Sequence, residues 1–161
     1  MAEVNPIRDT DDEARALARR LLDEARFGAL GVLDPATGAP VVTRIAVGTT
    51  PTGAPLTLIS SLAFHTGALR ADPRCSLLLG EPGDRGDPLT HPRVTLACRA
   101  SFLPREGPDH ARIRAHYLAS HPKATLYVDF ADFSFVVFAV ESAALNGGFG
   151  KAFRLTPSDL A

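Results

Sequence analysis

The stretch GALGVLDPATGAPVVTRIAVGTTPTGAPLTLIS, residues 28–60, decides the fold of this chain. It contains three short runs rich in β-branched residues, 28–34, 39–49 and 54–60, which are separated by PATG and TPTG. Proline presets one backbone angle of a turn and glycine accepts a positive φ, so these separators predict hairpins between consecutive strands.

The remaining segments extend this pattern with helices inserted between strands. We expect helices over residues 9–28 and 107–122, where apolar residues recur at helical spacing, with cap residues at 9–11 and Gly28 as the end of the first helix. Further strands are expected at 75–81, 93–103, 124–129 and 133–145. The alternation of strand, long helix and strand that is typical of a doubly wound parallel sheet is missing. The sequence therefore predicts a mainly β fold, a small antiparallel barrel with flanking helices.

Composition narrows the class of protein. With 161 residues, 45% of them hydrophobic and 22% charged, the chain has the size and composition of one globular domain, residues 1–161. Its net charge of −1 favours neither nucleic acid nor an anionic membrane as a partner. The first twenty residues do not form a secretory signal, and Cys75 and Cys98 lie in apolar runs that predict small buried residues. We therefore expect a cytoplasmic protein.

The segment LISSLAFHTGALRADP, residues 58–73, carries the most chemistry. A strand turns into a helix there, which places Ser60 or Ser61 at the N-cap of the helix. One interpretation is a capping serine beside surface polar groups. The other is a phosphate site, because a helix N-terminus offers free N–H groups and a partial positive charge. In that case Ser61 and His65, four residues apart, share a helix face, and Thr66 adds a donor.

Two arginines and a glycine-rich segment are further candidates. Arg44 lies in an otherwise apolar run, so it is either an outward-facing strand residue or a cation directed at the same anion. Arg93 makes a similar case at the start of another strand. The segment ALNGGFGKAF, residues 144–153, predicts a tight turn or a close backbone approach to a flat ligand.

Other kinds of site find little support in the sequence. The five histidines show no pair at the i, i+4 spacing of a helical metal site. The chain has no Gly-x-Ser-x-Gly elbow, no Walker loop and no Gly-x-Gly-x-x-Gly between a strand and a helix. Covalent catalysis and Rossmann-type binding are therefore not expected, and no catalytic acid or base stands out.

Four motifs together resemble a known family. They are Ser-Leu-Ala-x-His-Thr at 61–66, Asp-Pro-Leu-x-His-Pro-Arg at 87–93, Asp-Phe-x-Asp-Phe at 129–133 and Gly-Gly-Phe-Gly-x-Ala at 147–152. With them, residues 10–155 resemble the pyridoxamine 5′-phosphate oxidase-like split-barrel flavoproteins, most of all the haem-utilisation (HugZ-like) branch. The resemblance implies a six-stranded antiparallel split β-barrel and a homodimer that binds two FMN molecules in clefts at its interface.

The resemblance also assigns roles to residues. Arg44, Ser61, His65 and Thr66 would hold the FMN phosphate, and His65 stands where vitamin-forming oxidases of the family have a lysine. The remaining cofactor contacts that it implies, along the ribityl chain and the ring, are Ile45, Ala46, Ile59, Ser60, Arg93 and Phe149.

The leading hypothesis is thus an FMN-dependent oxidoreductase acting on a small-molecule substrate. A second hypothesis is a haem-binding or haem-utilisation protein in which His91, His65 and Arg93 contact iron or propionates. A third is a flavin-binding module without catalytic activity, which would bind FMN that no nicotinamide donor reduces.

Overall fold

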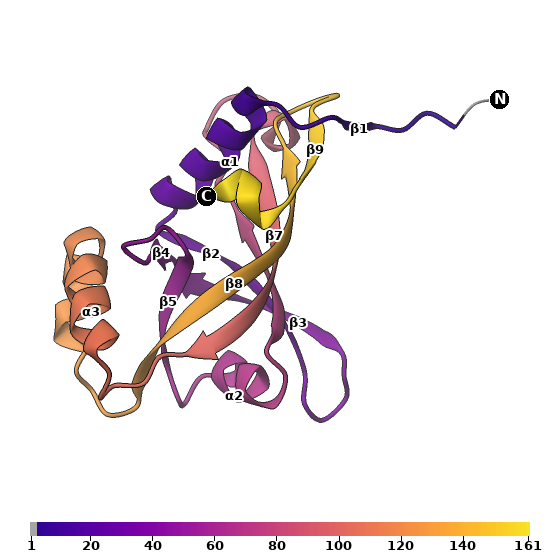
Figure 1. Ribbon diagram of the computed structural model, residues 1–161. Coiled ribbons are helices and arrows are strands. Elements are labelled where there is room, and N and C mark those ends of the chain that lie inside the picture. The colour runs from indigo at the N-terminus through magenta and orange to yellow at the C-terminus, as the bar shows by residue number, and fades with distance from the viewer. Residues whose placement is uncertain (1–2) are drawn as a thin grey trace.

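The computed structural model describes residues 3–161 as a sheet curved around its own core, with three α-helices outside it (Figure 1). The helices are α1 Asp12–Glu24, α2 Phe64–Ala71 and α3 Pro108–Ser120, with short 3-10 helices η1 Pro88–Thr90, η2 Pro122–Leu126 and η3 Pro157–Leu160. The strands are β1 Ile7–Arg8, β2 Phe27–Leu33, β3 Pro40–Ala46, β4 Gly48–Thr49, β5 Pro55–Ser60, β6 Arg74–Leu79, β7 Arg93–Phe102, β8 Phe133–Asn146 and β9 Ala152–Leu155.

The sheet follows the order β1-β9-β8-β7-β6-β2-β3, and β5 leaves this path to pair with β8 and β4. Neighbouring strands are antiparallel except β1 and β9, which run parallel. The expected class, mainly β with flanking helices in a split barrel, is confirmed. The described residues form nine strands rather than six, because β1 and β4 are two-residue strands and β9 adds a third short one.

Helix α1 begins where the sequence predicts and ends earlier. The Asp11 side chain accepts a hydrogen bond from the Ala14 N–H at 2.7 Å, which is an N-cap contact. The expected end at Gly28 is wrong, because the helix stops at Glu24 and Gly28 lies inside β2. A Cβ at Gly28 would lie 2.7 Å from Leu79 Cδ2, so this glycine allows close packing within the barrel.

A second correction concerns residues 124–129, which were expected to form a strand. They form the end of η2 and the turns after it. Pro122 stands in the first turn of η2, where its fixed φ suits a helix and its missing N–H costs nothing. The Thr125 hydroxyl also donates to the Pro122 carbonyl at 2.7 Å, a local bond that competes with strand pairing.

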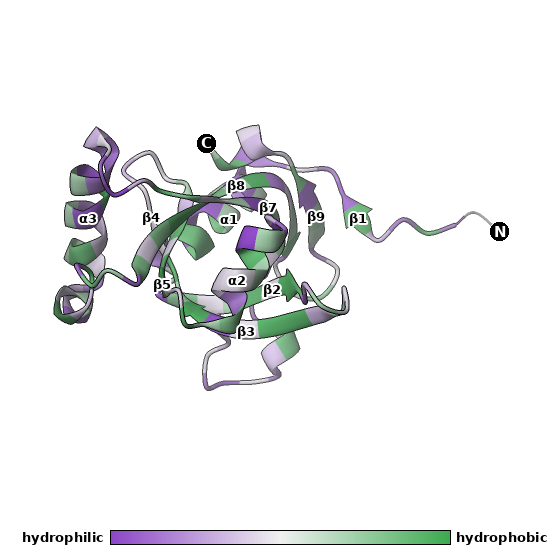
Figure 2. Cartoon of the chain, turned by 90° about the horizontal axis from the view of Figure 1, so that it is seen from below, coloured by the Kyte–Doolittle hydropathy of each residue, from purple (hydrophilic) through white to green (hydrophobic). Residues whose placement is uncertain are grey.

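The apolar side chains form two clusters. The larger one fills the barrel between the inner faces of the strands and the buried faces of α1 and α2. The smaller one lies between α3, β5 and the start of β8. Figure 2 shows hydrophobic colouring on β2, β3 and β5. Alternation of inward and outward side chains divides the residues of β2 and β3 between core and surface, whereas β5 is buried on both faces, between the two clusters.

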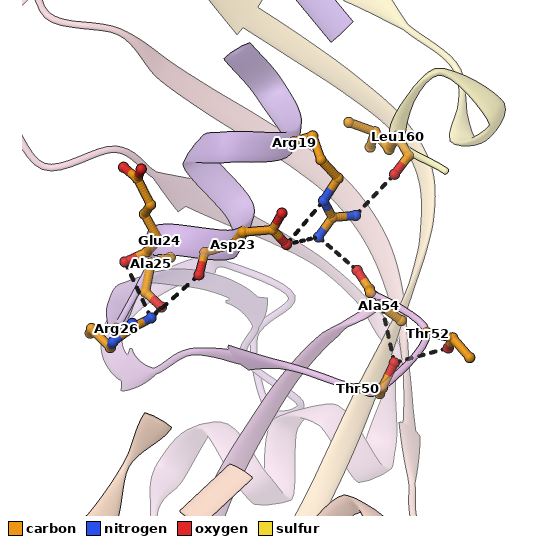
Figure 3. Close-up of polar contacts among 10 residues, drawn as sticks. Arg19, Asp23, Glu24, Ala25, Arg26, Thr50, Thr52, Ala54 and Leu160 are labelled. Atoms are coloured by element: carbon orange, nitrogen blue, oxygen red, sulfur yellow. Dashed lines mark hydrogen bonds and ion pairs between the residues drawn. The ribbon is translucent and has the colours of Figure 1, made fainter. Parts of the chain in front are cut away.

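A polar clamp fixes the C-terminal part of α1, just before β2 (Figure 3). The Arg19 guanidinium donates to Asp23 on its own helix, to the Leu160 carbonyl at 2.9 Å and to the Gly53 carbonyl at 2.9 Å. Arg19 therefore joins α1 to the β4–β5 turn and to η3. Across residues 3–161, none of the helices combines the length and the apolar character that crossing a membrane requires.

Candidate functional site

The outer face of the sheet carries an open pocket of about 450 Å³ between β2, β3, β6 and the loop that leads into β7. Arg44 and Arg93, two of the predicted residues, both line it. Phe27, Val42 and Leu78 supply apolar walls. The structure thus brings together two guanidinium groups and a hydrophobic surface at one place.

Strand alternation sets the direction of Arg44. Its neighbour Ile45 is buried in the barrel core, so the Arg44 side chain lies on the exposed face of β3. The guanidinium carbon stands 5.5 Å from the centre of the Phe27 ring. No carboxylate among residues 3–161 pairs with Arg44. Its charge is therefore free to meet an anionic ligand.

His91 holds together the loop at the edge of the pocket. Its Nδ1 accepts the Gly83 N–H at 3.0 Å, which leaves Nε2–H to donate to the Arg85 carbonyl at 2.6 Å. Arg93 donates to the carbonyl of Leu89 at 3.0 Å. Both ring nitrogens of His91 are thus occupied, and neither has a free lone pair for a metal in this geometry.

The N-cap of α2 is not the residue that the sequence predicts. Neither serine is the N-cap of α2, because the helix starts at Phe64 and its N-cap is Ala63, whose side chain makes no capping bond. Ser60 instead shapes the turn before the helix: its hydroxyl donates to Asp132 Oδ2 at 2.7 Å and accepts the Leu62 N–H at 3.1 Å. A hydroxyl that closes such a local turn favours an irregular start over a regular cap.

Thr66 and Ser61, two further residues of this segment, have different environments. Thr66 is 1% exposed and its hydroxyl donates to the Ser60 carbonyl at 2.5 Å. The Ser61 side chain is exposed and forms no hydrogen bond within residues 3–161. Thr66 therefore builds the turn, whereas Ser61 keeps a hydroxyl available at the surface.

His65 is half-buried and is oriented by β3. Its Nδ1 lies 3.0 Å from the Thr43 hydroxyl. Burial lowers the pKa of His65 below its usual 6.5, so its imidazole is neutral at neutral pH. Nε2 has no partner within residues 3–161, and no buried side-chain nitrogen or oxygen there lacks one, so Nε2 reaches solvent. It can exchange a hydrogen bond with a ligand without contributing a positive charge.

The pocket and the turn meet at β3. Thr43, which contacts His65, and Arg44, which lines the pocket, are consecutive and lie on opposite faces of the strand. On the sheet path of the described residues β3 is the last strand, so its second edge has no continuous ladder. A ligand lying along that edge can contact both faces.

The remaining predicted residues lie elsewhere. Ile45 and Ile59 are buried in the barrel core, and the Ala46 carbonyl accepts the Thr57 hydroxyl at 2.6 Å. Phe149 is 77% exposed in the glycine-rich turn between β8 and β9, and it does not line the outer-face pocket. The roles of these four residues toward a cofactor stay predictions.

Sequence reasoning missed two residues of this region. Thr43 orients His65, and Asp132 accepts the Ser60 hydroxyl. Asp132 belongs to the Asp-Phe-x-Asp-Phe motif, which the sequence marks only through its resemblance to a family. Thr43 carried no signal, since a threonine in a β-branched strand is ordinary.

The arrangement suits a flat ligand with acidic groups. A volume of about 450 Å³ is typical of small-molecule sites, which span roughly 300–1,000 Å³. Apolar walls can cover a planar ring, and the two guanidiniums can neutralise phosphate or carboxylate groups. Within residues 3–161 no group of three potential metal ligands comes together. The lining is therefore chemically suited to a flat, anionic ligand.

Fold and site together define a split-barrel protein with a cofactor-type pocket on its outer face. Residues 9–160 match the model of the CREG β-barrel family, and the chain belongs to this family. A solved structure from the pyridoxinephosphate oxidase family of Clostridium acetobutylicum shares the fold, with a TM-score of 0.69 over 94% of this chain and 100% of the other, at 12% identity.

Two relatives are more similar in sequence. The chain is 42% identical over 102 residues to the non-canonical heme oxygenase HOZ, chloroplastic, of Arabidopsis thaliana, which covers 63% of this chain and 30% of the plant protein. It is 32% identical to a heme binding protein from Mycobacterium smegmatis, with a TM-score of 0.82 over 91% of this chain and 59% of the other. The chain thus spans about a third of the plant relative and less than two thirds of the mycobacterial one.

Proposed function

We propose that this protein binds FMN along β3, with the flavin ring against the outer-face pocket and the phosphate at the start of α2. The single observation that supports this best is that two consecutive residues of β3 reach both places: the Thr43 hydroxyl lies 3.0 Å from His65 Nδ1, and the unpaired Arg44 guanidinium lines the outer-face pocket. The first-turn N–H groups of α2 add donors and a partial positive charge.

In this proposal Arg44 is the main cation of the phosphate site. Burial lowers the pKa of His65 in the cofactor-free protein, and in this proposal its imidazole contributes a hydrogen bond to the phosphate. Ser61 adds a second donor. Arg93 also lines the pocket, where its guanidinium donates to the Leu89 carbonyl, and in this proposal it contacts the ring or its substrate.

We further propose a homodimer that covers the pocket. Phe27, Val42, Leu78 and Leu89 are all large, exposed hydrophobic residues, and all four line the pocket. Val42 is 70% exposed and Leu78 is 44% exposed. Exposed apolar residues that gather at one place are typical of interaction surfaces, and a second copy would add the other wall of the cofactor cleft.

FMN would supply hydride or electron transfer, and the chain would supply binding, orientation and exclusion of water. No carboxylate, histidine or thiol of the described residues stands free inside the pocket as an obvious acid or base, apart from the exposed Glu81 at its rim. The proposed class is therefore an oxidoreductase for a small-molecule substrate in which the cofactor does the chemistry. Residues 1–161 act as a single cofactor-binding domain in this proposal.

Haem is the second candidate, and the observation that favours it is the sequence similarity to a heme oxygenase and a heme binding protein. The two guanidiniums suit propionates as well as a phosphate. Of the two histidines considered for iron, His91 is engaged through both nitrogens and His65 has Nε2 free. A haem complex would thus use His65 or leave the iron without a ligand from this region.

For the compartment we propose the cytoplasm. Cys75 and Cys98 are register partners across β6 and β7, and both are buried free thiols. Neighbouring cysteines that pack as buried thiols suit a reducing compartment, which in this proposal keeps them reduced.

The test is the absorbance spectrum of the purified protein, followed by separate titrations with FMN and with haemin. The proposal predicts flavin bands as purified, or saturable uptake of FMN at one molecule per chain. A Soret band on adding haemin, lost in His65→Ala, together with no uptake of FMN, would replace the flavin proposal by the haem one. The absence of any uptake would overturn both.

A further inference from the structure

The Asp-Phe-Ala-Asp-Phe segment, residues 129–133, is held from two sides and in turn holds the candidate phosphate site. Asp129 forms a two-bond ion pair with Arg114 of α3, at 2.9 and 2.7 Å. Arg105 donates to the carbonyls of Phe130 and Phe133, the latter at 2.6 Å. These contacts fix the backbone immediately before β8.

Asp132 connects this segment to the turn before α2. Its Oδ2 accepts the Ser60 hydroxyl at 2.7 Å and its carbonyl accepts the Ser61 N–H at 2.7 Å. One residue thus holds two consecutive serines, one through its side chain and one through its backbone. The contact spans 72 positions of sequence, so no local preference of the turn could replace it.

Most hydrogen bonds of this turn are made to Ser60. Its carbonyl accepts the buried Thr66 hydroxyl at 2.5 Å and the Ala63 N–H at 3.1 Å. With its hydroxyl on Asp132 and Leu62, Ser60 has no donor left for a ligand. The four polar residues of this segment therefore divide into two that build the turn, Ser60 and Thr66, and two that face outward, Ser61 and His65.

We propose that Asp132 is a positioning residue for the anionic cofactor: it sets the place of Ser61 and of the first turn of α2 by gripping Ser60, without touching the cofactor. This inference rests on the proposed function for its ligand. It goes beyond that proposal by adding Asp132 to the site, and it gives Ser60, which the resemblance placed among the cofactor contacts, a role in the turn.

The experiment compares two carboxylates of the same segment. Asp132→Ala removes the acceptor of Ser60, whereas Asp129→Ala removes the ion pair with Arg114 and leaves Ser60 untouched. Fluorescence titration with FMN, and absorbance titration with haemin, should show a Kd raised about tenfold in Asp132→Ala, which is the weight of one charged hydrogen bond. In Asp129→Ala, Arg105 still holds the segment through the Phe130 and Phe133 carbonyls, so this variant should bind within about twofold of wild type.

Two further variants separate positioning from general loss of stability. Asp132→Asn keeps an oxygen acceptor for Ser60 and should restore most of the affinity. Ser60→Ala combined with Asp132→Ala should lose less affinity than the two single variants lose together, because the Ser60–Asp132 hydrogen bond can be removed only once, although Ser60→Ala also removes the acceptor of the Leu62 N–H. Equal affinities of Asp132→Ala and wild type, equal losses in the two alanine variants of the segment, or additive losses in the double variant would each overturn the inference.

Amide hydrogen exchange of the cofactor-free protein makes the inference independent of the ligand. Asp132→Ala should speed the exchange of the Leu62 and Thr66 amides, and Asp129→Ala should not. If the wild-type protein takes up neither FMN nor haemin, the proposed function fails, and exchange alone decides whether Asp132 orders the turn. Unchanged exchange in Asp132→Ala would overturn that role.

Discussion

Replacing Arg44 with alanine should weaken FMN binding strongly while leaving the fold intact. The guanidinium lies on the exposed face of β3, over the Phe27 ring, and has no acid partner within residues 3–161. An exposed cation–π contact contributes about 0.5–1 kcal/mol, so the free energy of unfolding should fall by no more than that. A hydrogen bond to a charged group contributes about 1.5–3 kcal/mol, which corresponds to a Kd raised about 10- to 150-fold.

The assay is quenching of flavin fluorescence, with the thermal unfolding midpoint recorded on the same samples. Arg44→Lys keeps the charge and loses the two-pronged geometry, so its affinity should lie between those of the wild type and the alanine variant. Arg99→Ala is the matched control, since Arg99 is exposed on β7 and pairs with Glu141 at 3.4 Å outside the pocket. An Arg44→Ala protein that binds within about twofold of wild type, or an equal loss in Arg99→Ala, would refute the assignment.

Three further predictions concern stability, reactivity and assembly. Burial lowers the pKa of His65 below 6.5, so in the pH range just below that value the unfolded chain binds more protons than the folded one, and the free energy of unfolding should rise with pH. Urea unfolding at several pH values should show a smaller slope of this free energy against pH in His65→Gln. An unchanged slope would contradict the prediction. Burial raises the pKa of Cys75 to about 12 and that of Cys98 as well, so neither thiol should react with a disulfide reagent until the protein unfolds; rapid reaction of the native protein would contradict this. Light scattering should show that Leu78→Glu converts the dimer into a monomer, whereas Leu126→Glu, at an exposed position on η2, leaves it dimeric. A monomeric wild-type protein would contradict the proposed homodimer.

The sequence predicted those parts of the fold that depend on local chemistry. Pro and Gly in the separators between residues 28 and 60 predicted hairpins, and Asp11 predicted the start of α1. Failures came where packing between distant strands overrides local preference. Gly28 is a helix terminator by composition, yet its place is fixed by the space that Leu79 leaves across the barrel.

Two residues that line the pocket could be predicted from the sequence, whereas the residues that build the turn before α2 could not. Arg44 and Arg93 each stood out as a cation in an apolar run, and the structure brings them to one pocket. The assignment of Ser60 and Thr66 to the turn depends on Asp132, 72 positions away from Ser60. A contact of that kind leaves no periodic pattern along the chain, so a single sequence cannot show it.

The most direct test of the central proposal is the affinity of the protein for FMN compared with riboflavin, which has the same ring and no phosphate. If Arg44, Ser61 and the first turn of α2 hold the phosphate, FMN should bind at least about 100-fold more tightly, the weight of two charged hydrogen bonds at about 1.5 kcal/mol each. Equal affinity for the two flavins, or uptake of neither, would contradict the proposed site.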